Sequence, residues 1–100
     1  MKINVLILGF VLVCSLNYGQ NQASNLSFNT LDSLIFSAYN QGDFNSALSY
    51  AQTAQKKAAK ERGTQDSIYL NHTVNLAYIY IELGELQLAE NKLLEVEKII

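Results

Sequence analysis

The chain contains no proline, five glycines, one cysteine and one histidine among its 100 residues. Without proline and with few glycines, little in the sequence obliges a helix to end, so helices of ordinary length are expected. The single cysteine, Cys14, excludes an intrachain disulfide and a cysteine metal cluster. The single histidine, His72, has no cysteine near it and no second histidine to join it, so we expect it on the solvated surface.

The sequence also lacks an excess of positive charge. Its formal net charge is −2 at pH 7, which offers no electrostatic surface for nucleic acid. Hydrophobic residues make up 49% of the chain, which indicates a folded domain. No glycine-rich phosphate loop is present, and no spacing suggests a nucleophile with its base. We therefore expect a protein without catalytic activity, metal or cofactor.

Residues 1–19 differ from the rest of the chain and have the order of a secretory signal peptide. Lys2 supplies a positive charge, an almost wholly apolar run follows over 3–13, and small and polar residues come next. The run is shorter than the roughly twenty residues that span a bilayer. We expect an exported protein, periplasmic or secreted, that meets the membrane only through this segment. A buried N-terminal helix is the alternative.

The position of signal cleavage stays open. Cleavage after Gly19 leaves Gln20 at the new N-terminus, whereas cleavage after Ser15 puts Val13 and Ser15 at the two recognition positions. Cys14 offers a third possibility, a lipoprotein acylated at this cysteine, although Val13 is larger than the residue usual before an acylated cysteine.

Beyond a polar, flexible leader over 20–28, apolar residues recur at intervals of three and four. The expected helices cover about 29–40, 44–60, 66–83 and 86–100. The short breaks between them imply antiparallel neighbours. The predicted fold is therefore all-α, with two antiparallel helix-turn-helix hairpins (29–62 and 66–100) stacked as a short α-solenoid.

The same pattern predicts caps and buried faces. The expected N-caps are Asn29 or Thr30, Asp43, and Asp66 or Ser67, with Asp32 in the first turn of the first helix. The expected buried side of the third helix includes Leu70, Thr73 or Val74, Ala77, Tyr80 and Ile81. The expected apolar face of the last helix comprises Leu86, Ala89, Leu93, Val96 and Ile100.

The two glycine breaks are equivalent. Gly42 and Gly84 lie 42 residues apart, and a shift by this distance superimposes apolar positions on both sides of the break. Examples are Leu34 on Leu76, Ala38 on Tyr80, Ala47 on Ala89 and Ala51 on Leu93. A fixed period of this length, built on helix-turn-helix units, indicates a solenoid.

The segments around both glycines resemble the tetratricopeptide repeat. Residues 38–48 (AYNQGDFNSAL) have a glycine that closes the first helix, an aromatic residue two positions later and an alanine three positions after that. Residues 75–90 (NLAYIYIELGELQLAE) are similar to the longer repeats of the kinesin light chain type, whose period is also about 42. Both repeats lack the closing proline of the family, and a generic four-helix bundle is the alternative.

The resemblance implies a scaffold that binds another protein. In this family the first helices of successive repeats line a concave groove, which holds a peptide or a helix of the partner. Carried over residue by residue, the groove positions are Asp32, Phe36, Tyr39, Asn40, Asn71, Asn75, Tyr78, Ile81 and Glu82. The aromatic residues among them offer flat apolar area for a partner, or alternatively pack against a neighbouring repeat.

Two repeats are few for a solenoid, and residues 96–100 are rich in apolar side chains without a capping helix. One interpretation is a small self-associating adaptor that forms a homodimer through this last helix. The other is the leading part of a longer protein, in which repeats of this kind continue into a CHAT protease domain or a sensor histidine kinase. In that case the segment would be the sensory or docking part.

Overall fold

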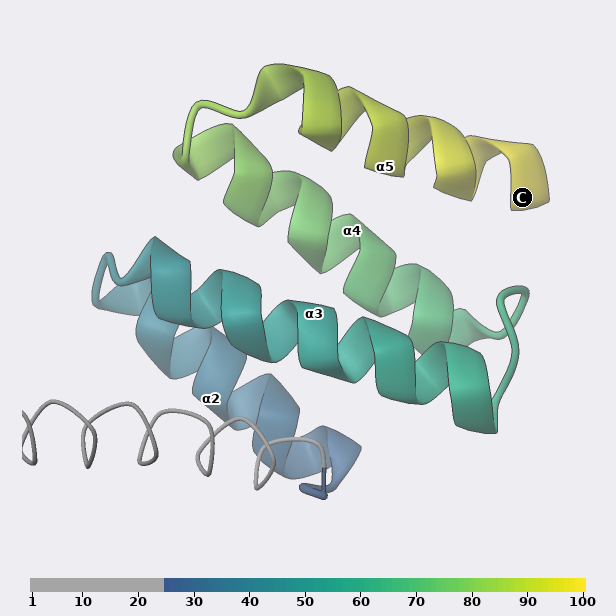
Figure 1. Ribbon diagram of the computed structural model, residues 1–100, viewed down its shortest axis with the longest axis horizontal. Helices are drawn as coiled ribbons and strands as arrows, with labels where there is room; N and C mark the ends of the chain where they lie inside the picture. Colours follow the sequence, from purple (N-terminus) through teal and green to yellow (C-terminus); the bar gives the residue numbers. More distant parts are fainter. Residues whose placement is uncertain (1–24) are drawn as a thin grey trace, which may run out of the picture.

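The structure, a computed structural model, describes residues 25–100, and the expected signal peptide and most of the expected leader lie outside this part. The described part is all-α, as the sequence predicts. Its helices are α2 (Phe28–Asn40), α3 (Phe44–Glu61), α4 (Ser67–Glu82) and α5 (Leu86–Ile99). Each helix packs on the next in chain order, so α2–α3 and α4–α5 form two stacked hairpins (Figure 1).

The two hairpin turns share one hydrogen-bond pattern at a distance of 42 residues. The residue after each glycine donates its backbone N–H to the carbonyl oxygen four residues before that glycine, at 2.9 Å in the first turn and 2.8 Å in the second. Gly42 has a φ of 76° and Gly84 a φ of 78°. This left-handed conformation ends a helix and is open to glycine without the steric penalty of a Cβ. The expected equivalence of the two breaks is confirmed.

Side chains cap two of the helices as expected. The Asp43 carboxylate accepts a hydrogen bond from the backbone N–H of Ser46, and the Asp66 carboxylate accepts one from the N–H of Ile68. Each bond satisfies a donor that a helix N-terminus leaves free. In the second hairpin turn Glu85 takes the cap position of α5 without such a bond.

The start of α2 differs from the expectation. The helix begins at Phe28, and its cap is Ser27, whose hydroxyl accepts a hydrogen bond from the N–H of Thr30 at 3.2 Å. The expected cap at Asn29 or Thr30 is therefore wrong, because Ser27 supplies a side-chain oxygen that caps the helix two or three residues earlier. The earlier start also moves Asp32 out of the first turn.

Small residues on α3 let α2 and α4 approach it closely. Four alanines at intervals of three and four, Ala47, Ala51, Ala54 and Ala58, are completely buried along this helix. A larger side chain there would force the helices apart. The core around them comprises Leu31, Ile35, Ala38, Ala47, Ala51, Ala54, Leu76, Ile79, Tyr80 and Ala89.

Some positions expected to be buried are exposed. Ile81 lies at the edge of the buried face of α4, and on α5 only Ala89 is buried, whereas Leu86, Leu93 and Ile100 are exposed. The apolar side chains of α5 are exposed because few helices pack against it. In the described part of the chain α3 is packed between α2 and α4, but α5 has one main neighbour, α4.

Candidate functional site

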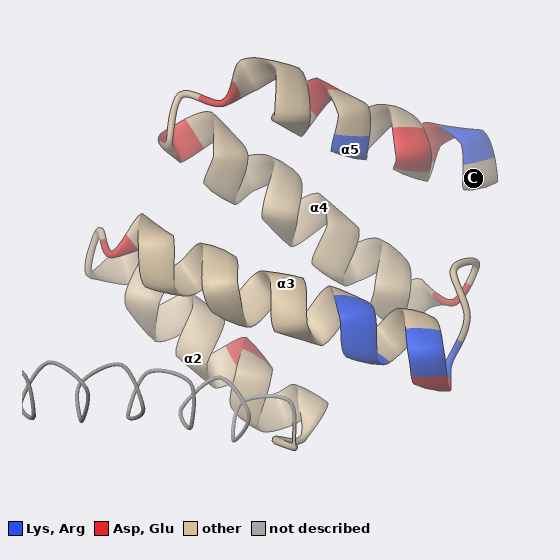
Figure 2. Ribbon diagram, viewed as in Figure 1, with Lys and Arg blue, Asp and Glu red and all other residues tan. Residues whose placement is uncertain are grey.

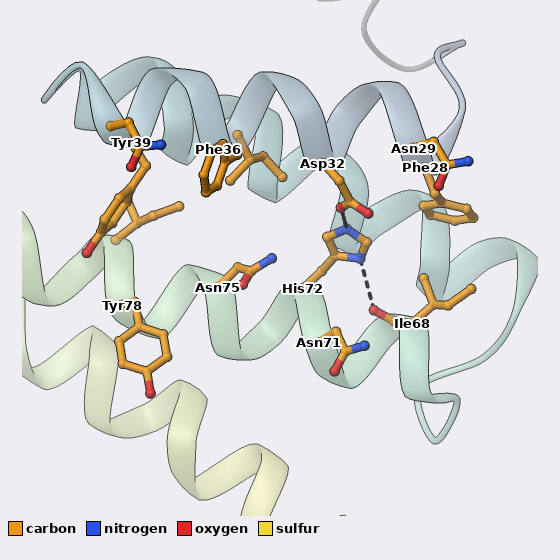
Figure 3. Close-up of a pocket in the computed structure, with 13 residues that line it drawn as sticks. Phe28, Asn29, Asp32, Phe36, Tyr39, Ile68, Asn71, His72, Asn75 and Tyr78 are labelled. Atoms are coloured by element: carbon orange, nitrogen blue, oxygen red, sulfur yellow. Dashed lines mark hydrogen bonds and ion pairs between the residues drawn. The ribbon is translucent and has the colours of Figure 1, made fainter.

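A groove of about 650 Å³ lies between α2 and α4, the first helices of the two hairpins (Figure 3). Its lining residues are Phe28, Asn29, Asp32, Ile35, Phe36, Tyr39 and Asn40 from α2, and Ile68, Asn71, His72, Asn75, Tyr78 and Ile79 from α4. On both helices they recur at intervals of three and four, so each helix turns a single face toward the groove. The groove therefore follows directly from the stacking of the two hairpins.

The groove contains seven of the nine positions that the family resemblance implies. These are Asp32, Phe36, Tyr39, Asn40, Asn71, Asn75 and Tyr78. The other two, Ile81 and Glu82, do not line it. Glu82 lies beside its end, where its Oε1 accepts a hydrogen bond from the hydroxyl of Tyr39 at 3.1 Å.

The three aromatic residues that the family resemblance places in the groove differ in their exposure and contacts. Phe36 is 70% exposed and Tyr78 57% exposed, so both present free apolar area. Tyr39 instead packs its ring edge-to-face on Phe44, with centroids 5.3 Å apart. Burial and then the neighbouring Glu82 carboxylate raise the pKa of Tyr39, which keeps its hydroxyl protonated as a donor. Phe36 and Tyr78 are thus available to a ligand, whereas Tyr39 ties the two hairpins together.

His72 forms the floor of the groove, and its expected surface position is wrong. The side chain is only 3% exposed. Its Nδ1 lies 2.9 Å from the carbonyl oxygen of Ile68, and its Nε2 lies 2.8 Å from Oδ1 of Asp32 on the facing helix. A buried polar side chain requires such partners. The histidine therefore joins α2 to α4.

Both partners of His72 offer oxygen atoms to its ring nitrogens. A carbonyl oxygen and an ionised carboxylate both accept hydrogen bonds and donate none. Both ring nitrogens of His72 thus have a polar partner within hydrogen-bond distance, one on its own helix and one on α2. The ring of Phe28 stacks on the imidazole with centroids 5.8 Å apart.

The spacing of His72 in the sequence does point to a buried position. His72 stands three residues after Tyr69 and four before Leu76, both of which are buried, so it lies on the apolar stripe of α4. Its polarity led to the wrong prediction. The sequence pattern places Phe28 in the polar leader, although it is the first residue of α2.

Polar groups in the groove are mostly uncharged. Neither lysine nor arginine lines it, and its acidic residue Asp32 is paired with His72. Lysines gather instead toward the end of α3 (Figure 2), where Nζ of Lys57 lies 5.0 Å from the ring centre of Phe28 at one end of the groove. The carboxamides of Asn71 and Asn75 stand on the α4 side, one helical turn apart (Figure 3). A carboxamide both donates and accepts, so this wall is able to pair with a peptide backbone.

Within residues 25–100, no group of three or more histidine, cysteine, aspartate or glutamate side chains is arranged to hold a metal ion. None of the helices in this part is both long and apolar enough to span a membrane. No protein-family model, curated protein or solved structure significantly matches the chain.

Proposed function

We propose that the chain is a tetratricopeptide-type module that binds a segment of another protein in the groove between α2 and α4. The observation that carries this proposal is the pair of exposed aromatic side chains, Phe36 and Tyr78, that line one groove from opposite helices. Large aromatic side chains left exposed in a concave site are typical of binding surfaces. They give much contact area with little loss of side-chain entropy.

The polar groups of the groove suit a peptide. Asn71 and Asn75 lie one turn apart, about 6 Å along the helix axis, and their carboxamides can pair with main-chain N–H and C=O groups. Because no lysine or arginine lines the groove, an acidic segment finds no counter-charge there. An uncharged or basic segment with apolar side chains fits better.

The proposed role is binding without catalysis, in an exported protein. Export rests on the signal-peptide pattern of residues 1–19 and the family on the repeat pattern around Gly42 and Gly84. The register of the two hairpin turns supports the family, because one repeat unit reproduces the other at 42 residues.

Site-specific photo-crosslinking tests where the partner binds. Benzoylphenylalanine placed at Phe36 or Tyr78 in the native host is expected to crosslink the same protein, which mass spectrometry then identifies. The matched control is the same probe at Ser49, an exposed position on α3 that does not line the groove. Crosslinks of equal yield from Ser49 would contradict a groove-specific partner.

Affinity measurements with the crosslinked partner then test the aromatic residues. Phe36→Ala and Tyr78→Ala are each expected to weaken binding about tenfold, since truncated aromatic anchors in interfaces cost about 1.4 kcal/mol or more. Both side chains are exposed, so circular dichroism should show an unchanged fold. A folded double variant that keeps the affinity of a Ser49→Ala control would refute the proposed function.

A further inference from the structure

Each of the two exposed aromatic residues of the groove has a carboxylate one helical turn away. On α2, Asp32 precedes Phe36 by four residues, and on α4, Glu82 follows Tyr78 by four. Residues four apart are neighbours on one face of a helix, so each carboxylate stands next to an aromatic ring. Neither helix contains a lysine or arginine. Both walls of the groove therefore combine free aromatic area with an acidic group.

The two carboxylates differ in their contacts. Oδ1 of Asp32 lies 2.8 Å from Nε2 of the buried His72, so this carboxylate already links the two walls. Oε1 of Glu82 accepts a hydrogen bond from the Tyr39 hydroxyl, which is an uncharged donor. Within residues 25–100, none of the ion pairs involves Glu82. Glu82 is thus the acidic group at the groove that is open to a cation.

Glu82 belongs to one defined end of the groove. Tyr39 and Tyr78 lie at this end, and Phe28 lies at the other (Figure 3). At the Phe28 end, Nζ of Lys57 is 5.0 Å from the ring centre of Phe28. The charge beside the groove therefore changes sign from the Phe28 end to the Tyr39 end.

The edge of the stack at the Tyr39 end is acidic as a whole. Asp43 and Glu85 stand in the two hairpin turns at this edge, whereas the lysines of α3 lie at the opposite edge (Figure 2). Lys57 follows Asp43 by fourteen residues, which is about 21 Å along the helix axis. Charges in solution act over roughly 8 Å at physiological ionic strength. The lysines of α3 therefore do not neutralise the negative charge around Glu82.

An aromatic ring beside a carboxylate attracts a cationic side chain. The face of the ring attracts the cation, and the carboxylate accepts a charge-assisted hydrogen bond from it. Tyr78 is 57% exposed, and Glu82 is exposed as well. Side chains on a helix lean toward its N-terminus, which directs Glu82 over the turn that carries Tyr78. An arginine suits this site best, because its planar guanidinium stacks on an aromatic ring and pairs with a carboxylate.

We propose that the groove recognises a basic segment of its partner, with an arginine or lysine bound against the ring of Tyr78 and paired with the carboxylate of Glu82. This inference rests on the proposed peptide-binding function and adds the charge and the register of the peptide. The apolar residues of the segment extend from this cation along Phe36. An acidic segment is repelled by the carboxylates of the groove, and a reversed register places the cation beside Lys57, which also repels it.

Selection from a random library of short displayed peptides tests the chemistry of the ligand. The library is selected on the full chain, and the groove-binding peptides are those that wild type retains and Phe36→Ala releases. We expect these peptides to share an arginine or lysine at one position. On Glu82→Lys protein, selection should favour an aspartate or glutamate at that position instead, because the charge of the site is reversed.

Affinity measurements with one enriched peptide test the contact itself. Glu82→Gln should weaken binding about tenfold, since it removes a charge-assisted hydrogen bond, while its side-chain oxygen still accepts from the Tyr39 hydroxyl. The matched control is Glu85→Gln, which removes the same charge at the same edge outside the groove and should change the affinity less than about twofold. A peptide in which glutamine replaces the basic residue should bind Glu82→Gln and wild-type protein equally.

The outcomes separate this inference from the groove itself. If Phe36→Ala releases none of the retained peptides, the groove does not bind peptides, and the proposed function fails. Groove-binding peptides without a shared basic residue would overturn the inference alone. The same holds for an arginine peptide that binds Glu82→Gln protein as tightly as Glu85→Gln protein; in both cases the groove remains a peptide site.

Discussion

At the scale of single residues, the pair formed by His72 and Asp32 links the two walls of the groove. The imidazole is buried, and each of its nitrogens has one partner. Because one partner belongs to α2 and the other to α4, the pair fixes the distance between the two walls of the groove. Lys57 contacts the Phe28 end of the groove. Its Nζ donates to the carbonyl oxygen of Leu26 and lies 5.0 Å from the ring centre of Phe28.

Removing the carboxylate should destabilise the protein more than its exposed position suggests. Asp32→Ala leaves Nε2 of His72 buried without a partner, which costs about 1–2 kcal/mol. His72→Phe keeps the ring and its stacking but loses both hydrogen bonds. In a double-mutant cycle with the two changes we expect a coupling of about 1 kcal/mol, measured by urea unfolding. Ser33→Ala, on the exposed side of the same helix, is the control. If Asp32→Ala unfolds at the same urea concentration as this control, the pair of His72 and Asp32 contributes nothing to the free energy of unfolding.

The sequence allowed some of these residue roles to be predicted. Phe36, Tyr78 and Asn75 follow from the repeat pattern, because the position of a residue on a helix fixes the face it occupies. The buried state of His72 does not follow from its own helix alone. It depends on Asp32, forty residues earlier, which only the stacking of the hairpins brings into contact.

At the scale of elements, the helices end and begin through local chemistry. Asp66 caps α4, and its carboxylate accepts a hydrogen bond from the N–H of Ile68 at 2.9 Å. This bond, and then the guanidinium of Arg62, lower the pKa of Asp66 below its ordinary value. The ionised form is therefore favoured in the folded state, and the cap depends on pH.

The pH dependence has a definite sign. A carboxylate with a lowered folded-state pKa contributes stability that is present above its unfolded pKa, about 3.9, and is lost as the pH falls through the folded value. We expect the wild type to lose more stability than Asp66→Asn on acidification from pH 5 to about pH 2. Asparagine caps a helix but does not titrate in this range. Thermal unfolding at several pH values measures the difference; parallel curves would show that Asp66 makes no pH-dependent contribution.

Helix boundaries were predictable for the same local reason. Glycine breaks and aspartate caps determine where α3, α4 and α5 begin, and these starts match the sequence pattern within one residue. Burial was less predictable. The apolar face of α5 looks like a core face in sequence, but a face is buried only when a neighbouring helix covers it.

At the scale of the whole molecule, stability should fall along the stack toward α5. In a solenoid each helix is stabilised mainly by its immediate neighbours. α3 has two of them, whereas α5 is held chiefly by α4, through Ala89 and the hydrogen bond from the Tyr69 hydroxyl to Glu95. Local opening should therefore begin at α5.

Native-state hydrogen exchange tests this gradient at matched positions. The amides of Leu93 and Ala51 occupy equivalent places in the repeat, yet Ala51 is buried between two helices. We expect the amide of Leu93 to be protected at least about tenfold less than that of Ala51, a difference of about 1.4 kcal/mol in opening free energy. Equal protection of the two amides in the free protein would mean that all four helices open together, and that α5 is held by contacts as strong as those of α3.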